Sequence, residues 1–214
     1  MLTLYFTPGA CSLAPHIVLE ESGEKYEKHN VDMAKNEQKS EPYLKINAQG
    51  RVPALRLDDG YSLTENTAIL PYLGKRFGLW PTDPIAEAKA LSLIGFFAAS
   101  VHPAHAHFGR PERYSADPAA FPAIKEAGLK TFHGYLKQID AMLAGREWLT
   151  DKYSVLDPYG LVFYAWGFRR ELPVGELKHY SAFKDRMLQR PAVRRVAAEE
   201  KLAIARDLAV RTAV

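Results

Sequence analysis

The chain has 214 residues, of which 47% are hydrophobic and 25% are charged, and its formal net charge is +3 at pH 7. This is the composition of a globular protein with one large or two small domains. It contains no dense basic stripe interleaved with aromatic residues, so we expect no nucleic-acid partner.

The first eighty residues alternate between strand and helix patterns. Short runs of strand-forming residues predict strands, and apolar residues three or four apart predict helices. The predicted order is a βαβ unit, a short helix and a ββα unit. The elements are a strand over 2–6, a helix ending at Gly23, a strand over 26–31, a short helix from Ser40 to about Asn47, a hairpin around 58–60 and a helix after Glu65 that Gly78 ends.

From Leu79 onward the spacing of apolar residues is helical, after a proline-rich connector over 81–86. Asp83 predicts a helix N-cap, with Pro84 at the first helical position. Pro103 is expected to kink or end this helix. Six residues at spacings of three or four share one side of it, and the small ones would let another element approach closely; the six are Ile85, Ala88, Ser92, Gly95, Ala99 and His102.

Further helices complete the second half. Ser154 and Asp157 have the spacing of a capping box, with Asp in place of the usual Glu. The segment that follows is apolar on nearly all sides, so we expect the central buried helix there. The other predicted helices cover about 118–144, which Gly145 ends, 181–189 and 191–200.

Cys11, the only cysteine, lies where the first strand passes into the first helix. Free N–H groups and the helix dipole favour a thiolate at such a turn. Lowering a thiol pKa by about two units needs roughly 2.7 kcal/mol, whereas a helix terminus contributes about 0.3–1 kcal/mol. Further donors are therefore required, and Ser12, a histidine from the helical half and Tyr5 are the candidates. The alternative, an inert buried core cysteine, stays open.

Three histidines, His102, His105 and His107, lie within six residues. They suggest a metal site, but Pro103 disrupts the helical register and no second ligand cluster has metal spacing. We therefore predict no metal. A histidine that donates a hydrogen bond toward the first half is the preferred interpretation, and His102 is best placed because it ends the small-residue side.

Two further segments could bind a ligand through the backbone. Pro53 begins a predicted strand, and a cis Val52–Pro53 bond would expose the Val52 backbone for pairing with a ligand. Glu65 and Asn66 open a predicted helix, where they could hold both an ammonium and a carboxylate. The alternatives, an ordinary strand start and plain helix capping, stay open on these residues alone.

Three features of the sequence indicate the cellular compartment of the protein: its first residues, its apolar runs and its single cysteine. Residues 1–19 lack a basic leader and a long apolar centre, so we expect no signal peptide. The densest apolar run, residues 160–168, is far shorter than the roughly 20 residues that span a bilayer. One cysteine cannot form an internal disulfide, which fits a reducing compartment. We expect a cytoplasmic protein with no membrane partner.

Taken in order, these features resemble the glutathione transferases, specifically the bacterial beta class with its cysteine near the N-terminus. The resemblance covers essentially the whole chain. It implies an α/β plus all-α fold: a thioredoxin-like domain over 1–80, a linker over 81–86 and an all-helical domain over 87–214. The segments that carry it are YFTPGACSLAPHIVL, INAQGRVPAL, LTENTAILPYL, SVLDPYG and QRPAV.

The resemblance also implies a ligand, glutathione as co-substrate, bound between the two domains. Cys11 would face the glutathione sulfur, and His102 would be brought to the thiol from the helical domain. The Val52 backbone, with a cis Pro53, would pair with the cysteinyl part. The remaining implied contacts are Glu65 with Asn66 for the γ-glutamyl end and Lys35 for the glycine carboxylate.

Two positions depart from the family pattern. Asn66 stands where many relatives have serine or glycine, and it can still donate to a carboxylate. Gly95 stands where beta-class members often have an asparagine that reaches the glutathione sulfur, so Ser12, His102 or His105 would compensate. The implied electrophile pocket lies near His105, Phe108 and Trp166.

The resemblance implies a bacterial detoxification enzyme, a homodimeric transferase that activates the glutathione thiol for attack on small electrophiles. Glutathione-dependent disulfide reduction through Cys11 is a second enzymatic hypothesis, in which a second glutathione replaces the missing resolving cysteine. The alternative from another class is a non-catalytic binding or interaction module on the same fold.

Overall fold

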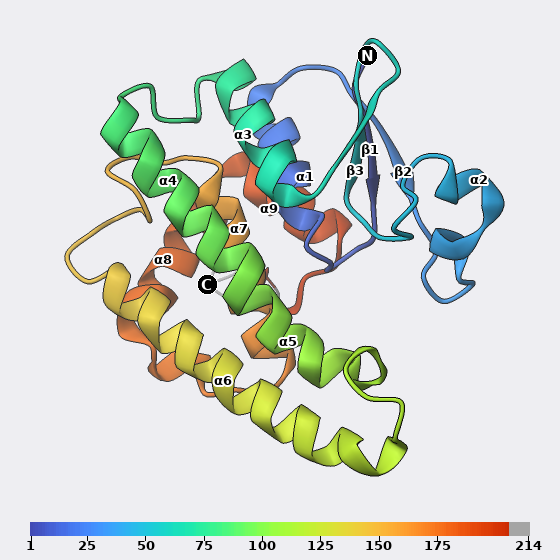
Figure 1. Ribbon diagram of the computed structural model, residues 1–214. Coiled ribbons are helices and arrows are strands. Elements are labelled where there is room, and N and C mark those ends of the chain that lie inside the picture. Colours follow the sequence, from blue (N-terminus) through green and yellow to red (C-terminus); the bar gives the residue numbers. More distant parts are fainter. Residues whose placement is uncertain (206–214) are drawn as a thin grey trace.

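The computed structural model describes residues 1–205 of the protein, shown in Figure 1 with the sheet on one side and the long helices on the other. Four strands form one sheet in the order β2-β1-β3-β4. β1 pairs with β2 in parallel and with β3 antiparallel, and β3 and β4 form the predicted hairpin. The strands are β1 (Thr3–Phe6), β2 (Glu27–Asn30), β3 (Ala54–Arg56) and β4 (Ser62–Thr64).

Helices connect and cover these strands in the predicted βαβ and ββα order. The first helix, α1 (Leu13–Ser22), links the two parallel strands and ends at Gly23, whose φ of 69° is left-handed. Ser40 caps the short α2 (Glu41–Leu44) by accepting a hydrogen bond from Tyr43 N. The last helix of this half, α3 (Asn66–Phe77), ends at Gly78 and packs against α1. This is the predicted thioredoxin-like arrangement.

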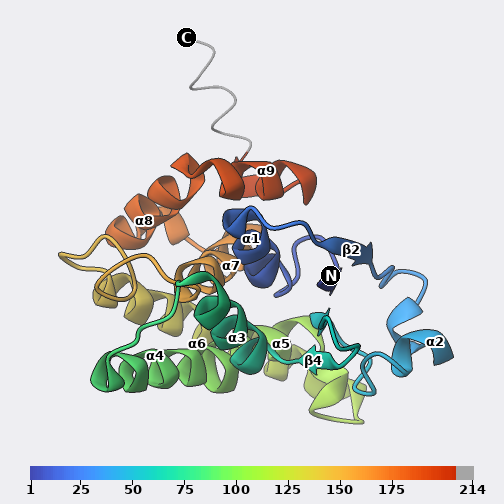
Figure 2. The ribbon, with the colours of Figure 1, turned by 90° about the horizontal axis from the view of Figure 1, so that it is seen from above.

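The second half is entirely helical within the described residues, as predicted. Figures 1 and 2 show α4 followed by α5 along one side, with α6 beside α5. α7 is the buried central helix, and Tyr159, Val162 and Phe163 on it are at most 1% exposed. The helices are α4 (Pro84–Phe96), α5 (His102–Gly109), α6 (Phe121–Met142), α7 (Leu156–Arg169), α8 (Lys178–Gln189) and α9 (Pro191–Glu199).

The capping box before α7 is formed by the predicted residues. Ser154 N donates to Asp157 Oδ2 at 2.7 Å, and Ser154 Oγ accepts from Leu156 N at 3.3 Å. Asp157 Oδ1 also accepts from Leu149 N at 2.9 Å, which ties the preceding loop to the helix. Burial nevertheless raises the pKa of the Asp157 carboxyl to about 7. A cap of this kind contributes about 0.5–2 kcal/mol to stability.

The boundary between the halves differs from the prediction in one detail. α4 begins at Pro84, where Asp83 accepts hydrogen bonds from Ile85 N and Ala86 N, so the helix starts inside the predicted linker of residues 81–86. One continuous hydrophobic core joins the first half to the second. The predicted division into 1–80 and 87–214 stays a proposal, and residues 206–214 lie outside the described part.

The outer side of α4 is exposed, which differs from the expectation that another element would cover it. Ile85 is 68% exposed, and the buried side of the helix instead carries Ala90 and Ile94. Pro103 does not end the helix, because a π-helical turn over Phe97–Val101 leads directly into α5. Such a turn leaves room for a residue that has no N–H to donate.

The helical stretch Pro84–Gly109 is long and apolar enough to cross a membrane by length and composition, and only 22% of its most apolar window is buried. The densest apolar run, residues 160–168, does not reveal the length of this apolar helix. The core helix of a soluble protein can pass the same test.

Candidate functional site

The turn that carries Cys11 is held by hydrogen bonds from its own residues and from the helical half. Ser12 Oγ accepts from Thr7 N at 3.1 Å and donates to the Thr7 carbonyl at 3.2 Å. Gly9 has a left-handed φ of 70°; its carbonyl accepts from Trp166 Nε1 at 2.9 Å. The Ser12 hydroxyl therefore closes the turn, and the expectation that it bonds the Cys11 sulfur is wrong in this structure.

The Cys11 thiol is buried, with 9% of the residue exposed, and it faces the strand entry. Its Sγ donates a hydrogen bond to the Val52 carbonyl at 3.4 Å. Burial raises the pKa of Cys11 to about 12, although the N–H groups of Cys11 and Ser12 and the charge of Arg110 act in the opposite direction. Burial of the sulfur therefore opposes the expected thiolate more strongly than the helix N-terminus favours it, and the thiolate stays a prediction.

The Val52–Pro53 peptide bond is cis, the geometry that the family resemblance implied. Val52 and Pro53 are both buried and lead into β3. The carbonyl of Arg51, the residue before Val52, accepts hydrogen bonds from Tyr43 Oη at 2.6 Å and from Asn47 Nδ2 at 2.7 Å. The Val52 backbone thus lies directly beside the Cys11 sulfur.

Glu65 and Asn66 begin α3 close to the same turn. Asn66 is 4% exposed, and its Nδ2 donates to the Cys11 carbonyl at 3.0 Å. Its Oδ1 is buried without a hydrogen-bond partner in the described residues. Glu65 has a φ of 67°, and its side chain makes no capping hydrogen bond, so plain capping does not explain it. Unfavourable backbone conformations of this kind cluster at functional sites.

His102 reaches the site from the first turn of α5. Its Nδ1 lies 3.5 Å from Tyr159 Oη on α7. Burial, followed by the charges of Arg110, Arg51 and Arg113, lowers the pKa of His102 to about 4. The imidazole is therefore neutral at pH 7 and can either donate or accept a hydrogen bond.

Tyr159 is a site residue that sequence reasoning missed. Its ring is 1% exposed, and its hydroxyl lies near enough to Cys11 and Asn66 for both to affect its pKa, which burial raises most strongly. A buried tyrosine hydroxyl normally has a hydrogen-bond partner. The available signal was a tyrosine in the predicted buried helix, which also carries Tyr164.

The proposed electrophile pocket is closely packed around two of its three residues. His105 stacks on Trp166 with ring centroids 4.1 Å apart, and they are 8% and 5% exposed. The Arg170 guanidinium lies 4.6 Å from the centre of the Phe108 ring, and its Nε donates to His105 Nε2 at 3.5 Å. Burial lowers the pKa of His105 to about 3. The three predicted residues thus lie near one another, with Arg170 linking Phe108 to His105.

Two other predicted residues are less closely placed. Lys35 is 84% exposed and pairs with Asp32 Oδ2 at 3.2 Å. A Cβ on Gly95 would meet no atom within 4 Å among the described residues. The structure therefore contains no contact that assigns either residue to the Cys11 site.

The histidine cluster is divided among different partners. His107 Nδ1 donates to the Pro103 carbonyl at 2.7 Å and its ring stacks on Tyr114, whereas His105 stacks on Trp166. Within residues 1–205, no three His, Cys, Asp or Glu side chains lie together as a metal would require.

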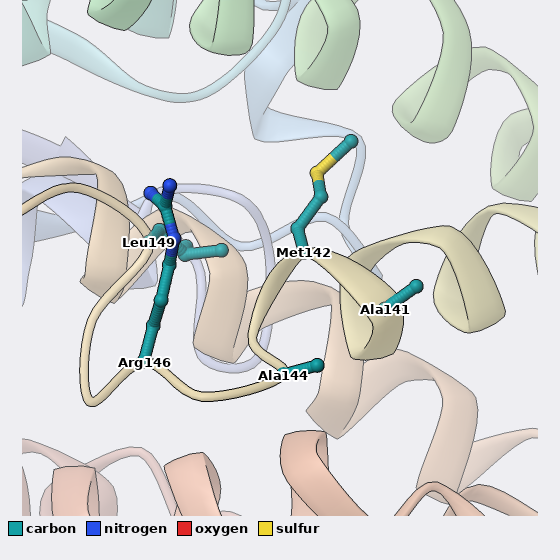
Figure 3. A pocket seen from close by; sticks show the side chains of 5 residues that line it. All are labelled: Ala141, Met142, Ala144, Arg146 and Leu149. Atoms are coloured by element: carbon teal, nitrogen blue, oxygen red, sulfur yellow. The ribbon is translucent and has the colours of Figure 1, made fainter.

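Two hollows lie away from the Cys11 turn. Figure 3 shows one of about 370 Å³ after the end of α6, lined by Ala141, Met142, Ala144, Arg146 and Leu149. A second, of about 280 Å³, lies between α5 and α6 around Pro103, Gly128 and Tyr135. Neither hollow includes a predicted site residue.

Comparisons with known proteins agree with this fold. Residues 1–75 match the family model of the glutathione S-transferase N-terminal domain. Glutathione S-transferase GstA of Escherichia coli O157:H7 is 31% identical over 94% of this chain and 100% of its own. A glutathione transferase homologue from Sulfitobacter, solved with bound glutathione, has a TM-score of 0.88 and 34% identity, covering 93% of this chain and 98% of its own.

A bacterial beta-class glutathione S-transferase from Sphingomonas chungbukensis is also similar, with a TM-score of 0.82 and 31% identity over 94% of this chain and 100% of its own. A thioredoxin-like domain followed by a helical domain, with a thiol at the first strand-to-helix turn, defines the class of protein. The chain belongs to the glutathione transferase family.

Proposed function

We propose that this member of the family is an enzyme that joins glutathione, through its sulfur, to small electrophiles. The observation that carries the proposal is the buried Asn66 Oδ1, an acceptor without a partner in the described residues, beside the Cys11 turn. Buried acceptors of this kind are normally paired. A ligand that donates hydrogen bonds there would restore the missing partner.

Glutathione supplies groups that match the surrounding residues. The ammonium of its γ-glutamyl end would donate to Asn66 Oδ1 and to the Glu65 carboxylate. Its cysteinyl backbone would pair with Val52 next to Pro53. Lys35 would bind the glycine carboxylate after leaving Asp32, a surface ion pair of the kind worth about 0–1 kcal/mol.

The chemical step requires a stabilised glutathione thiolate. The glutathione thiol loses its proton to solvent, the sulfur lone pair forms a bond to the electrophilic carbon, and the leaving group departs with its electron pair. A neutral His102, held by Tyr159, would donate one hydrogen bond to the sulfur anion, and the Cys11 S–H another. Positioning and electrostatic stabilisation would supply the acceleration.

The electrophile would bind beside the rings of His105, Phe108 and Trp166. His105 and Trp166 are nearly buried, so this pocket would present their edges and the half-buried Phe108 ring. The relatives named glutathione S-transferases support the transferase reaction. A role in detoxification in a bacterial cytoplasm would follow from such chemistry.

Disulfide exchange through Cys11 is the less favoured reaction. Exchange needs the Cys11 thiolate to attack a disulfide sulfur, and the pKa of about 12 opposes its formation. We expect Cys11→Ala to retain conjugation of a chloronitrobenzene within about tenfold, the loss of roughly one hydrogen bond. Loss of conjugation by a thousandfold or more, with a well-folded variant, would make Cys11 the essential group.

The non-catalytic module is tested by binding. If glutathione quenches the tryptophan fluorescence saturably and 1-chloro-2,4-dinitrobenzene is conjugated, the protein is an enzyme. Saturable quenching without conjugation of any compound in a panel of electrophiles would favour the binding module. If glutathione causes no saturable quenching and no electrophile is conjugated, the proposed glutathione site is wrong.

A homodimer would explain the exposed side of α4. Ile85 and Leu91 are 68% and 49% exposed on the apolar stretch Pro84–Gly109. Large exposed apolar patches commonly mark interaction sites. A second copy of the chain is the occupant we propose, in agreement with the homodimer that the family resemblance implies.

The dimer is measured by light scattering coupled to size exclusion. We expect twice the chain mass of 24.0 kDa for the wild type and a shift toward the monomer for Ile85→Glu. Ile85→Gln, which carries no charge, is the milder matched variant. A monomeric wild type that floats with lipid vesicles would assign this side of the molecule to a membrane instead.

A further inference from the structure

Three arginines without carboxylate partners lie beside the proposed glutathione site. Among residues 1–205, Arg51, Arg110 and Arg113 take part in no ion pair. Single unpaired arginines are common on protein surfaces, but three close together repel one another. Elsewhere in the structure arginines that lie near acidic residues are paired with them, as in Arg76, Arg190 and Arg195.

Two of the three are held by one tight turn at the end of α5. Arg110 N donates to the Ala106 carbonyl at 2.8 Å, and Arg113 N donates to the Arg110 carbonyl at 3.1 Å. The turn is a 3-10 helix over Pro111–Arg113, and Pro111 is buried. Arg110 immediately precedes this helix and Arg113 is its last residue. The turn therefore holds Arg110 and Arg113 together at the end of the helix that carries His102.

The third arginine comes from the thioredoxin-like half. Arg51 immediately precedes Val52, whose carbonyl accepts the Cys11 hydrogen bond. The Arg51 carbonyl is itself fixed by Tyr43 Oη and Asn47 Nδ2 at 2.6 and 2.7 Å. The backbone of Arg51 is therefore a rigid part of the site wall, with its side chain exposed.

The charges of all three arginines act on His102. After burial, the charges of Arg110 and Arg51 lower the pKa of Arg113, and all three arginines lower the pKa of His102. The Arg110 charge also favours the thiolate of Cys11. Glu112 is the acidic side chain of the same turn, and its charge raises the pKa of Arg113 without forming an ion pair with it.

Such a group of like charges is unfavourable unless an anion binds to it. Lys35 is the proposed partner of the glycine carboxylate of glutathione, so that carboxylate does not supply a counterion for the three arginines. Guanidinium groups bind carboxylates through two parallel hydrogen bonds, so a second carboxylate suits these charges.

We propose that Arg51, Arg110 and Arg113 form a subsite for the carboxylate of the second substrate, which makes this protein selective for small anionic electrophiles. The proposal rests on the proposed transferase function. In the reaction the glutathione sulfur attacks the electrophilic carbon, the leaving group departs as an anion, and the substrate carboxylate remains unchanged in the subsite.

Two chloronitroaromatic compounds test the selectivity. Both 4-chloro-3,5-dinitrobenzoate and 1-chloro-2,4-dinitrobenzene lose chloride to glutathione, but only the first carries a carboxylate. After correction for the uncatalysed rates, we expect kcat/KM of the wild type to favour the benzoate at least tenfold. Arg110→Gln and Arg113→Gln should each lower this preference about tenfold. The matched control, Arg56→Gln, removes one exposed charge on β3 and should change it less than twofold.

Two results would overturn the subsite. One is an unchanged preference in both variants. The other is a higher KM for glutathione in the variants with the same preference, because the arginines would then serve the glycine carboxylate.

A binding measurement separates this proposal from the proposed function. Calorimetric titration with 3,5-dinitrobenzoate, which has no leaving group, needs no turnover. We expect the Kd to rise about tenfold in Arg113→Gln and to increase with salt concentration. If the wild type turned over neither chloronitroaromatic compound, the transferase function would fall while this titration still decided the subsite; equal Kd values in wild type and variant would reject it.

Discussion

The Glu200 carboxylate, which follows α9 near the end of the described chain, accepts a hydrogen bond from Gly9 N in the Cys11 turn at 2.7 Å. Its other oxygen accepts from His16 Nδ1 on α1, also at 2.7 Å, and both the Glu200 and His16 side chains are fully buried. Two segments 191 residues apart thus share one buried carboxylate. The turn that bears the thiol is held in place from the helical half.

Replacement of Glu200 by glutamine keeps the shape of the side chain but converts one acceptor into a donor. We expect Glu200→Gln to lose about 1.5–3 kcal/mol of unfolding free energy, the usual worth of hydrogen bonds to a charged group. The neighbouring change Glu199→Gln affects the exposed pair with Lys28 and a longer contact of 3.9 Å with His16 Nε2, and it should cost under about 1 kcal/mol. Urea unfolding measures both, and equal effects would contradict the buried clamp.

The buried Cys11 thiol should react slowly with alkylating reagents. Because its pKa is raised to about 12, the thiolate fraction at pH 8 is far smaller than in a free cysteine. We expect the iodoacetamide rate to keep rising between pH 8 and pH 10 without a midpoint. N-acetylcysteine is the reference compound. A midpoint below about 8.5, the free-cysteine value, would restore the thiolate that the sequence favoured.

Acid should weaken the fold through His102 and His105. His102 and His105 have pKa values lowered to about 4 and about 3, so between these values and about 6.5 they are neutral when folded and protonated when unfolded. For these two groups the unfolded state binds more protons, so their contribution to stability falls as the pH is lowered from about 6.5 to about 4. Asp157, whose pKa is raised to about 7, binds its proton in the folded state over the same range and offsets about one of the two contributions.

The variant His105→Gln isolates one of these groups. Each such histidine contributes up to about 1.4 kcal/mol per pH unit to the slope of the unfolding free energy against pH in this range. The variant should lack the contribution of His105. Chemical denaturation at pH 6.5, 5.5 and 4.5 gives the slope for both proteins. The exposed His29, paired with Glu37 on the surface, offers His29→Gln as the control with a small change. Equal slopes for wild type and His105→Gln would refute the burial argument.

Two glycines of α6 should respond oppositely to the same substitution. A Cβ on Gly128 would lie 2.6 Å from His107 Cβ and 3.0 Å from the Ala104 carbonyl, where α5 crosses α6. A Cβ on Gly134 would meet nothing within 4 Å. Gly134→Ala should therefore gain about 0.5–1 kcal/mol of helix stability, and Gly128→Ala should lose about 1–3 kcal/mol through overpacking. Thermal unfolding distinguishes them, and a stabilised Gly128→Ala would show that the helices can separate without cost.

Local patterns were sufficient to predict most of the fold. Strand and helix periodicity, the glycine stops at Gly23 and Gly78 and the caps at Asp83 and Ser154 depend on neighbouring residues, so they are visible in one sequence. The exposed side of α4 was misjudged because the order of small residues does not reveal which side of a helix meets the core.

The candidate site was only partly predictable for a similar reason. The family resemblance brought Cys11, Val52 and Asn66 together, and the structure has contacts among them. The protonation of Cys11 could not be read from its place at a turn, because burial depends on the packing of distant residues. Tyr159 was missed since its contact with His102 spans 57 residues.

The hydrogen bond from Cys11 to the Val52 carbonyl bears on how long the protein survives in an oxidising environment. Peroxides attack the thiolate rather than the thiol, and overoxidation beyond the sulfenic acid is irreversible for most proteins. With no second cysteine in the chain to trap a sulfenic acid as a disulfide, a protonated and buried sulfur is its main protection.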